Sequence, residues 1–197
     1  MLRPRPSRRH PSERSLAQRA IAACAIVLMS CGLAARADTI AVRSAELHEE
    51  EGEVLLSADF AFTLNPTLEE ALSKGIALYI DLEFHLTRPR WYWVDDKVVD
   101  KVTTYRLSYA PLTRQYRVGS GLLSQGFATL DEVERFIGRV TSRPVANASE
   151  LAKGTRYDAA LRLHLDVNQL PKPLQVSAIA SREWQLSSDW LRWSFTP

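Results

Sequence analysis

The residues best suited to ligand binding lie in the segment RPRWYWVDD. Trp91, Tyr92 and Trp93 are three consecutive aromatic residues, preceded by Arg88 and Arg90. In an extended chain Trp91 and Trp93 point to one side and Tyr92 to the other. Two interpretations follow. Either the tryptophans are core anchors with large buried areas, or the segment forms an exposed aromatic shelf that stacks a sugar or grips a peptide.

Two histidines form a second candidate site. His85 shares one face of its segment with Asp81 and Glu83, and His164 lies beside Asp166. If the two segments were neighbouring strands, their oxygen and imidazole groups could converge on a metal ion. The sequence has no close ligand spacing such as HExxH, and the outer faces of strands carry polar residues by default. We therefore expect no metal site and no cofactor.

Sequence motifs for catalysis are missing. GSG at 119–121 lacks the G-x-S-x-G form of a nucleophile elbow, and the sequence has no glycine-rich phosphate loop or dinucleotide fingerprint. Asp95 and Asp96 are adjacent, so in a strand they would point to opposite faces, and a turn suits them better than a glycosidase pair. We expect a protein that is not an enzyme and has no catalytic residues.

The first 37 residues have the composition of a signal peptide. Six arginines precede the short uncharged run AIAACAIVLMSCGL, and Ala35 and Ala37 supply the small residues that signal peptidase requires before Asp38. A competing interpretation makes Cys31 the lipid-modified first residue of a lipoprotein. Both predict export, with a periplasmic or secreted domain over residues 38–197. That domain has no second apolar run of transmembrane length.

Removal of this leader changes the charge. Seven of the 25 basic residues and one of the 23 acidic residues precede Asp38, which leaves 18 basic against 22 acidic residues. Phosphate binding requires a basic patch, so we expect no nucleic-acid partner. Both cysteines, Cys24 and Cys31, also belong to the leader. The expected mature domain therefore has no disulfide.

Strict alternation of apolar and polar residues predicts most of the secondary structure. It predicts long half-buried strands at 76–87 and 156–168, and hairpins over 40–64 and 97–121 that turn near Gly52 and Pro111. A further strand is expected at 122–128, and the tail 174–195 also has a strand-like pattern.

Only two segments have a helical pattern. Residues 65–75 carry Thr67 and Glu70 as a capping box, and residues 129–140 carry Thr129 and Glu132 in the same roles. Many strands with short turns and few helices predict a mainly β single domain. We expect an antiparallel β-sandwich, immunoglobulin-like in its general architecture, with two short helices.

The pattern W-Y-W-x-D-D at Trp91 to Asp96, followed by Trp184, Trp190 and Trp193, resembles a family of exported proteobacterial proteins. This family is known as domain of unknown function 4390, or proline-rich signal peptide proteins, and the resemblance spans about Asp38 to Phe195. It carries over no catalytic residues. Genes of the family often lie beside a membrane sensor histidine kinase gene, which implies an envelope protein such as that kinase as a partner.

These observations favour a non-enzymatic binding module of the bacterial envelope. The alternative is a periplasmic protein that binds or processes carbohydrate through Trp91, Tyr92 and Trp93. For a fold of this kind, the simplest way to recognise a partner is an open sheet edge that pairs with the partner's strand.

Overall fold

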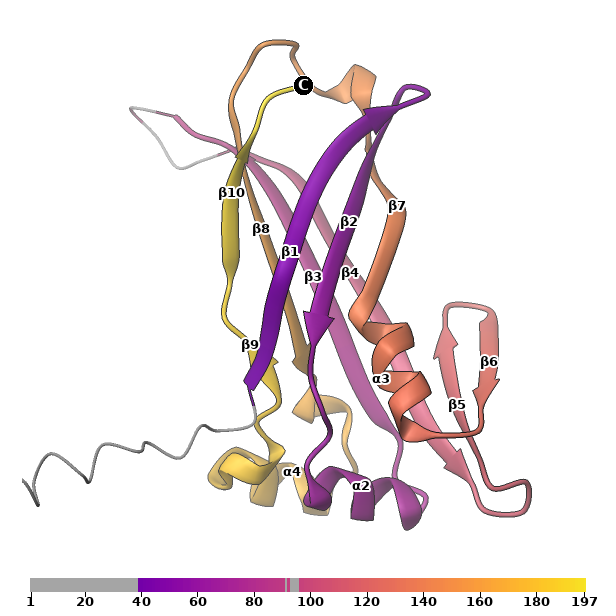
Figure 1. Ribbon diagram of the computed structural model, residues 1–197. Coiled ribbons are helices and arrows are strands. Elements are labelled where there is room, and N and C mark those ends of the chain that lie inside the picture. The colour runs from indigo at the N-terminus through magenta and orange to yellow at the C-terminus, as the bar shows by residue number, and fades with distance from the viewer. Residues whose placement is uncertain (1–38, 91, 93–95) are drawn as a thin grey trace, which may run out of the picture. The chain divides into compact units, whose positions relative to one another are not determined.

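The computed structural model describes residues 39–90, 92 and 96–197, and within them one curled sheet of ten strands dominates (Figure 1). The strands are β1 (Thr39–Glu50), β2 (Glu53–Ala61), β3 (Leu78–Arg88), β4 (Asp96–Ala110), β5 (Gln115–Ser120), β6 (Leu123–Phe127), β7 (Arg139–Asn147), β8 (Tyr157–Leu165), β9 (Ser187–Ser188) and β10 (Leu191–Phe195). Their order is β6-β5-β4-β3-β8-β9-β1-β2-β7, and β10 also pairs with β8. All pairs are antiparallel except β1 with β9.

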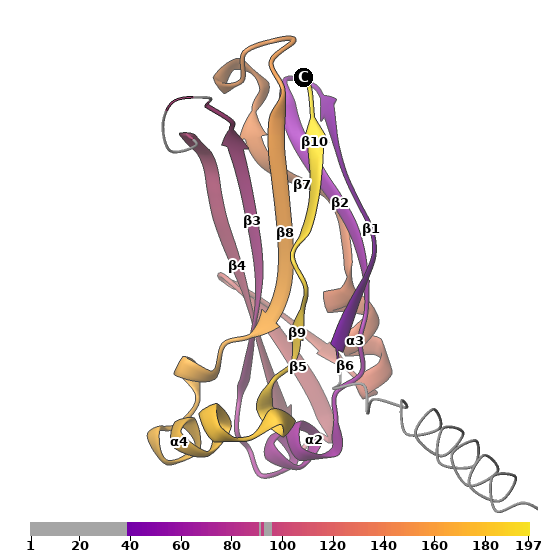
Figure 2. The same ribbon diagram turned by 90° about the vertical axis from the view of Figure 1, so that its left-hand side faces the viewer.

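The sheet curls into a half-barrel. Figure 2 shows β3 and β4 on one side and β1 and β2 on the other, with β8, β9 and β10 between them and β7 behind. The mainly β prediction is confirmed. Two separate sheets of a sandwich are not observed, and the immunoglobulin-like architecture is not confirmed, because β9 links β8 to β1 and makes the two walls one continuous sheet.

The core fills the concave side of this sheet. Alternate residues of β3 and β8 are buried, as their sequence pattern predicts, and they pair in register, for example Phe84 with Leu161. Fully burying an aliphatic or aromatic side chain of this size contributes about 1.5–3 kcal/mol. The alternation therefore fixes which face of each strand points inward.

Three α-helices accompany the sheet: α2 (Pro66–Ser73), α3 (Leu130–Gly138) and α4 (Lys172–Ala180). The two predicted helices are confirmed. The cap of α2 differs, because the Asn65 side chain, and not that of Thr67, accepts the hydrogen bond from Leu68 N. The capping box of Thr129 and Glu132 is present at α3. Short 3₁₀ helices lie at Ala148–Glu150, Val167–Gln169 and Arg182–Trp184.

Two segments depart from the predictions. The first half of the tail expected as strand is α4, whose first turn begins at Lys172-Pro173, where a missing proline N–H costs nothing. Strand β7 was not predicted at all, because the helical pattern of 129–140 overlaps its start, and two register shifts against β2 break its alternation. None of the helices in the described part of the chain is long and apolar enough to cross a bilayer.

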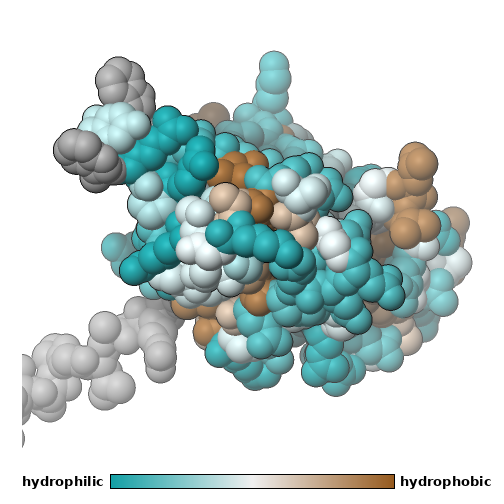
Figure 3. Space-filling model, turned by 90° about the horizontal axis from the view of Figure 1, so that it is seen from above, coloured by the Kyte–Doolittle hydropathy of each residue, from teal (hydrophilic) through white to brown (hydrophobic). Residues whose placement is uncertain are grey.

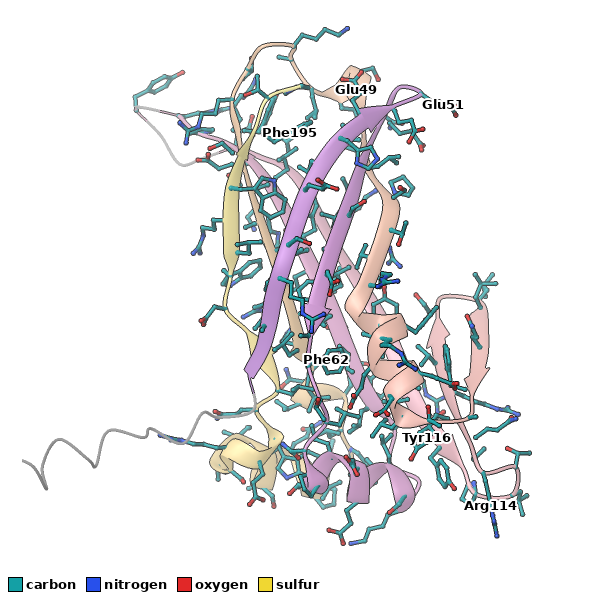
Figure 4. The ribbon with its side chains drawn as sticks, in the orientation of Figure 1. Glu49, Glu51, Phe62, Arg114, Tyr116 and Phe195 are labelled. Atoms are coloured by element: carbon teal, nitrogen blue, oxygen red, sulfur yellow. The ribbon has the colours of Figure 1, made fainter. Side chains whose placement is uncertain are left out.

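The two ends of the half-barrel differ. Glu49 and Glu51 lie at the tip of the β1–β2 hairpin, at the end opposite to Arg114 in the β4–β5 turn (Figure 4). Figure 3, which views the molecule from above, shows a mostly hydrophilic face with small apolar areas.

Candidate binding site

The predicted arginines at the aromatic segment are engaged in ion pairs. Nη2 of Arg88 and Nη2 of Arg90 donate to Oδ2 of Asp96 at 2.7 and 2.6 Å. Because β3 ends at Arg88 and β4 begins at Asp96, these bonds close the base of the connection between the two strands. They also hold the pKa of Asp96 below its usual range, chiefly through the hydrogen bond from Arg88.

The aromatic residues themselves fall in this connection. Tyr92 lies in a turn and is 67 % exposed. Trp91 and Trp93 lie outside the described residues, as does Asp95. The structure therefore shows one exposed ring of the predicted aromatic shelf.

The histidine segments are neighbouring strands, as the metal-site hypothesis required. Asp81 pairs with His164 and Glu83 pairs with Arg162 across β3 and β8. Arg162 donates to Oε2 of Glu83 through Nε at 3.1 Å and Nη2 at 2.6 Å. The Glu83 carboxylate, which lies 3.7 Å from Nε2 of His164, is therefore bound to a guanidinium. No group of three His, Cys, Asp or Glu side chains in the described chain is arranged to hold a metal ion.

The remaining members of the predicted metal set are dispersed. His164 contacts the backbone, with Nδ1 3.3 Å from the Asp81 carbonyl oxygen, and its Nε2 lies 3.7 Å from Glu83 Oε1. Asp166 caps a 3₁₀ helix, where its Oδ1 accepts from Asn168 N at 3.0 Å. His164 and Asp166 thus each have a local structural partner, whereas Oδ1 of the Asp81 side chain is buried without a hydrogen-bond partner among the described residues.

Trp190 covers this part of the outer face. Its ring lies 5.0 Å from the ring of His85, and the guanidinium of Arg162 stands 4.6 Å from its centroid. Nδ1 of His85 is buried 2.9 Å from Oδ1 of Asp100, an ion-pair distance without the alignment of a hydrogen bond. We name these residues the outer-face cluster: Glu83, His85, Asp100, Arg162, His164 and Trp190. Their mutual contacts indicate a network that stabilises the sheet.

A different site lies where the curled sheet fails to close. Strand β4 pairs with β5 only through Arg106–Ala110, and β7 pairs only with β2. Among the described residues, the edges of 96–105 in β4 and of 139–147 in β7 therefore have no strand partner on their outer sides. Unpaired edges present rows of backbone N–H and C=O groups. We call the region between these edges the β4–β7 seam.

A groove of about 550 Å³ lies in the β4–β7 seam. Both edge strands and their neighbours line it, through Glu53, Val98, Val99, Asp100, Lys101, Pro144, Val145, Ala146, Asn147 and Glu150. Val99 and Val145 are buried, so the floor is apolar, while the charged residues stand at the margins. Half of the lining residues are charged or polar, so the groove is more polar than a typical small-molecule site.

Two cations cross the seam in opposite directions. Lys101 of β4 donates from Nζ to the Pro144 carbonyl oxygen of β7 at 3.4 Å. Arg143 of β7 donates from Nη2 to the hydroxyl of Tyr105 of β4 at 2.8 Å, and its guanidinium lies 5.5 Å from the centre of that ring. Burial raises the pKa of the Tyr105 phenol, although Arg143 opposes this effect.

Neither cation has a carboxylate partner among the described residues. In the part of the chain that the structure describes, no acidic oxygen lies within 4.0 Å of Lys101 Nζ or of the Arg143 guanidinium. Sequence reasoning did not identify Lys101, Arg143 or Tyr105 as site residues, because their proximity depends on β7. A usable signal was Pro144, since a proline within a strand is typical of a sheet edge.

Comparisons with known proteins agree with the resemblance seen in the sequence. The family model described as Domain of unknown function (DUF4390) matches residues 37–194. No curated protein and no solved structure matches the chain. Because the matched range includes nearly all of the β-rich domain and far more than half of the chain, the protein belongs to the DUF4390 family.

Proposed function

We propose that the protein is a non-enzymatic binding module that recognises an extended segment of a partner protein by strand addition in the β4–β7 seam. One observation carries this proposal: two strand edges that face a common groove are bridged by side chains and not by backbone hydrogen bonds. In strand addition the backbone provides affinity, and pockets for alternate side chains provide specificity.

The length of the seam suits such a segment. Nine residues of β7 and ten of β4 present free edges, and a strand rises about 3.3 Å per residue, so each edge is about 30 Å long. Cα atoms of β4 and β7 approach within 8 Å, whereas an inserted strand needs about 4.8 Å on either side, so the two edges must first move apart by about 2 Å. The segment would then use both of its own edges. It would also remove two exposed edges, which otherwise invite unspecific pairing.

The leader supports an envelope location. Its basic start, its apolar run and Ala35-Arg36-Ala37 suit export with cleavage before Asp38. N-terminal sequencing of the protein from a periplasmic fraction should begin at Asp38. An N-terminal acylated Cys31 would support the lipoprotein alternative, and retention of the whole leader in the cytoplasm would refute export.

The family's gene context supports a membrane sensor histidine kinase as the partner. Cross-linking of a tagged chain in its native envelope, followed by mass spectrometry, tests this pairing. We expect the kinase to be enriched with the wild-type chain and lost when the seam is filled by Ala146→Trp. Equal enrichment with both chains would place the contact elsewhere.

The strand-addition proposal is tested with a displayed library of random nonapeptides selected on the immobilised protein. Ala146 lines the groove, so Ala146→Trp should abolish binding of the selected peptides. Ala110, which is also half-buried but lies beyond the groove where β4 pairs with β5, provides the control Ala110→Trp with unchanged affinity. Equal binding to both variants, or no selected peptide, would contradict the proposal.

A second measurement does not depend on how the variants fold. Selected peptides are resynthesised with N-methyl groups at alternate residues, which removes the backbone donors on one edge. A strand inserted between β4 and β7 should lose affinity whichever set is methylated. A peptide bound only through its side chains would tolerate both sets.

A carbohydrate-binding function is the second candidate, and the 67 % exposure of Tyr92 favours it. An exposed aromatic ring can stack on the face of a sugar. Intrinsic fluorescence titrated with cell-wall glycan fragments should then respond in the wild type and lose the response in Tyr92→Ala. An unchanged signal in the wild type would exclude this function for the glycans tested.

A further inference from the structure

We propose that the segment accepted by the β4–β7 seam carries an acidic side chain that points into the half-barrel between Lys101 and Arg143. This inference rests on the proposed strand addition and specifies its partner. The partner is an extended peptide with one carboxylate on its inward face, apolar residues two positions away on either side, and no acid on its outward face.

Both cations belong to the inner face of the sheet. Lys101 pairs with Phe84 in the β3–β4 register, and Phe84 is 1 % exposed in the core. Arg143 pairs with the fully buried Leu56 in the β2–β7 register and bonds to Tyr105. Cross-strand partners share a face. An inward side chain of an inserted strand would therefore lie between the two cations.

Insertion would change the environment of Lys101. Its present acceptor, the carbonyl of Pro144, belongs to the edge strand that an inserted segment would approach. Covering the seam would also remove water from the ammonium group, and an unpaired buried charge is costly. A carboxylate on the inserted strand compensates for this cost, and the Arg143 guanidinium can bind such a group through two N–H donors.

The same residues exclude unsuitable partners. Natural sheet edges are protected by lysine, by proline and by charges that point inward. Lys101 and Pro144 supply these features on the two edges of the seam. A wholly apolar strand would bury Lys101 without a partner, whereas a strand with an inward acid would not.

The outward side of the groove has the opposite charge. Asp100 pairs with His85 on the outer face, and Glu53 and Glu150 also stand at the margin. Asp100 already has ion pairs with His85 and Lys97, and Glu150 accepts from Asn147 Nδ2 at 2.8 Å. An outward acid on the partner would be repelled there. Along the inserted strand, inward positions therefore favour an acidic side chain and outward positions disfavour one.

The test is a change of selectivity in the nonapeptide library. Peptides selected on the wild type should carry Asp or Glu at one position with apolar residues two positions away. Lys101→Glu should select Lys or Arg at that position. Lys97→Glu makes the same charge change on β4 but outside the groove, and it should keep the wild-type preference. Replacing the peptide's Glu by Gln should weaken wild-type binding about tenfold.

The outcomes separate this inference from the proposed function. Two outcomes would overturn the inference and leave strand addition intact. In the first, the selected peptides lose binding in Ala146→Trp but have no preferred acidic position. In the second, Lys101→Glu selects the same acidic position as the wild type. A wild-type chain that dimerises in sedimentation, with the dimer lost in Lys101→Glu, would assign the seam to a second copy and also overturn it. Failure to select any peptide would refute both.

Discussion

Arg143 and Tyr105 join two strands that no backbone ladder joins. The guanidinium of Arg143 on β7 donates to the Tyr105 hydroxyl on β4 at 2.8 Å and lies 5.5 Å from the ring centre. Tyr105 is 3 % exposed, and the contact is partly buried. Together with Lys101 it bridges the seam through side chains and leaves the backbone edges without a strand partner.

This relationship predicts the titration of Tyr105. Burial raises its pKa and Arg143 lowers it, so removing the cation in Arg143→Leu should raise the Tyr105 pKa further. Ultraviolet difference titration of each chain against its Tyr105→Phe counterpart isolates this phenol. Arg139→Leu, at the exposed start of β7, is the control and should leave the Tyr105 titration unchanged. An unchanged titration in Arg143→Leu would show that the contact is absent in solution.

The outer-face cluster predicts a measurable coupling energy. The Glu83 and Arg162 side chains are 19 % and 29 % exposed and 2.6 Å apart, so a double-mutant cycle with Glu83→Gln and Arg162→Met should give about 1–2 kcal/mol. Arg156 and Asp158, 70 % and 48 % exposed and 3.6 Å apart, are the control pair and should couple by less than about 0.5 kcal/mol. Urea denaturation measures both cycles. Equal coupling in the two pairs would contradict the structural role of the cluster.

The parts of the fold that could be predicted from sequence are those with an uninterrupted local pattern. β3 and β8 alternate without a break, and the Thr129 capping box marks the start of α3, so both kinds of element were found. β7 could not be found in this way, because Ser142 has a φ of 42° and the register shifts twice against β2. A strand with bulges loses the two-residue period on which the prediction depends.

The candidate site was harder to predict for the same reason. The metal-site hypothesis required His85 and His164 to lie on neighbouring strands, and they do. The sequence does not show, however, that Arg162 would bind Glu83. The β4–β7 seam exists only because the sheet curls until β7 faces β4. That curvature is a property of the whole sheet, so no short segment encodes it.

The connection after β3 makes a prediction for Asp96. The hydrogen bond from Arg88 is the largest single cause of its lowered pKa, so Arg88→Ala should raise the Asp96 pKa toward the ordinary value of about 3.9. A carboxyl-detected NMR titration measures this pKa. Because the folded pKa is depressed, the pair stabilises the fold above the unfolded pKa and is lost as the pH falls through the folded one. An unchanged Asp96 pKa in Arg88→Ala would show that this hydrogen bond is absent in solution.

The raised pKa of Glu134 in α3 predicts that its contribution to stability depends on pH with the opposite sign. Its Oε1 accepts from Leu64 N at 2.8 Å, but burial is the larger effect and raises its pKa. Folding therefore favours the protonated form, and stability falls as the pH rises from the unfolded pKa, about 4.3, through the folded one. Glu134→Gln keeps an acceptor for Leu64 N and should reduce this fall in stability with pH. Urea denaturation between pH 4 and 8, in steps of about one pH unit, measures the fall. Glu51→Gln, in the exposed β1–β2 turn, is the control with wild-type behaviour.

The junction of α3 and β7 depends on a glycine that the seam needs. A Cβ at position 138 would lie 2.5 Å from the Phe60 carbonyl oxygen of β2, so the backbone would have to move in Gly138→Ala. We expect a loss of about 1–3 kcal/mol in urea denaturation. Gly126→Ala in β6 meets its nearest atom at 3.7 Å and should change stability by less than about 0.5 kcal/mol.

Because β7 starts directly after Gly138, Gly138→Ala should also displace the edge of the seam and weaken peptide binding, whereas Gly126→Ala should not. Full stability in Gly138→Ala would mean that β2 and α3 do not approach as closely in solution.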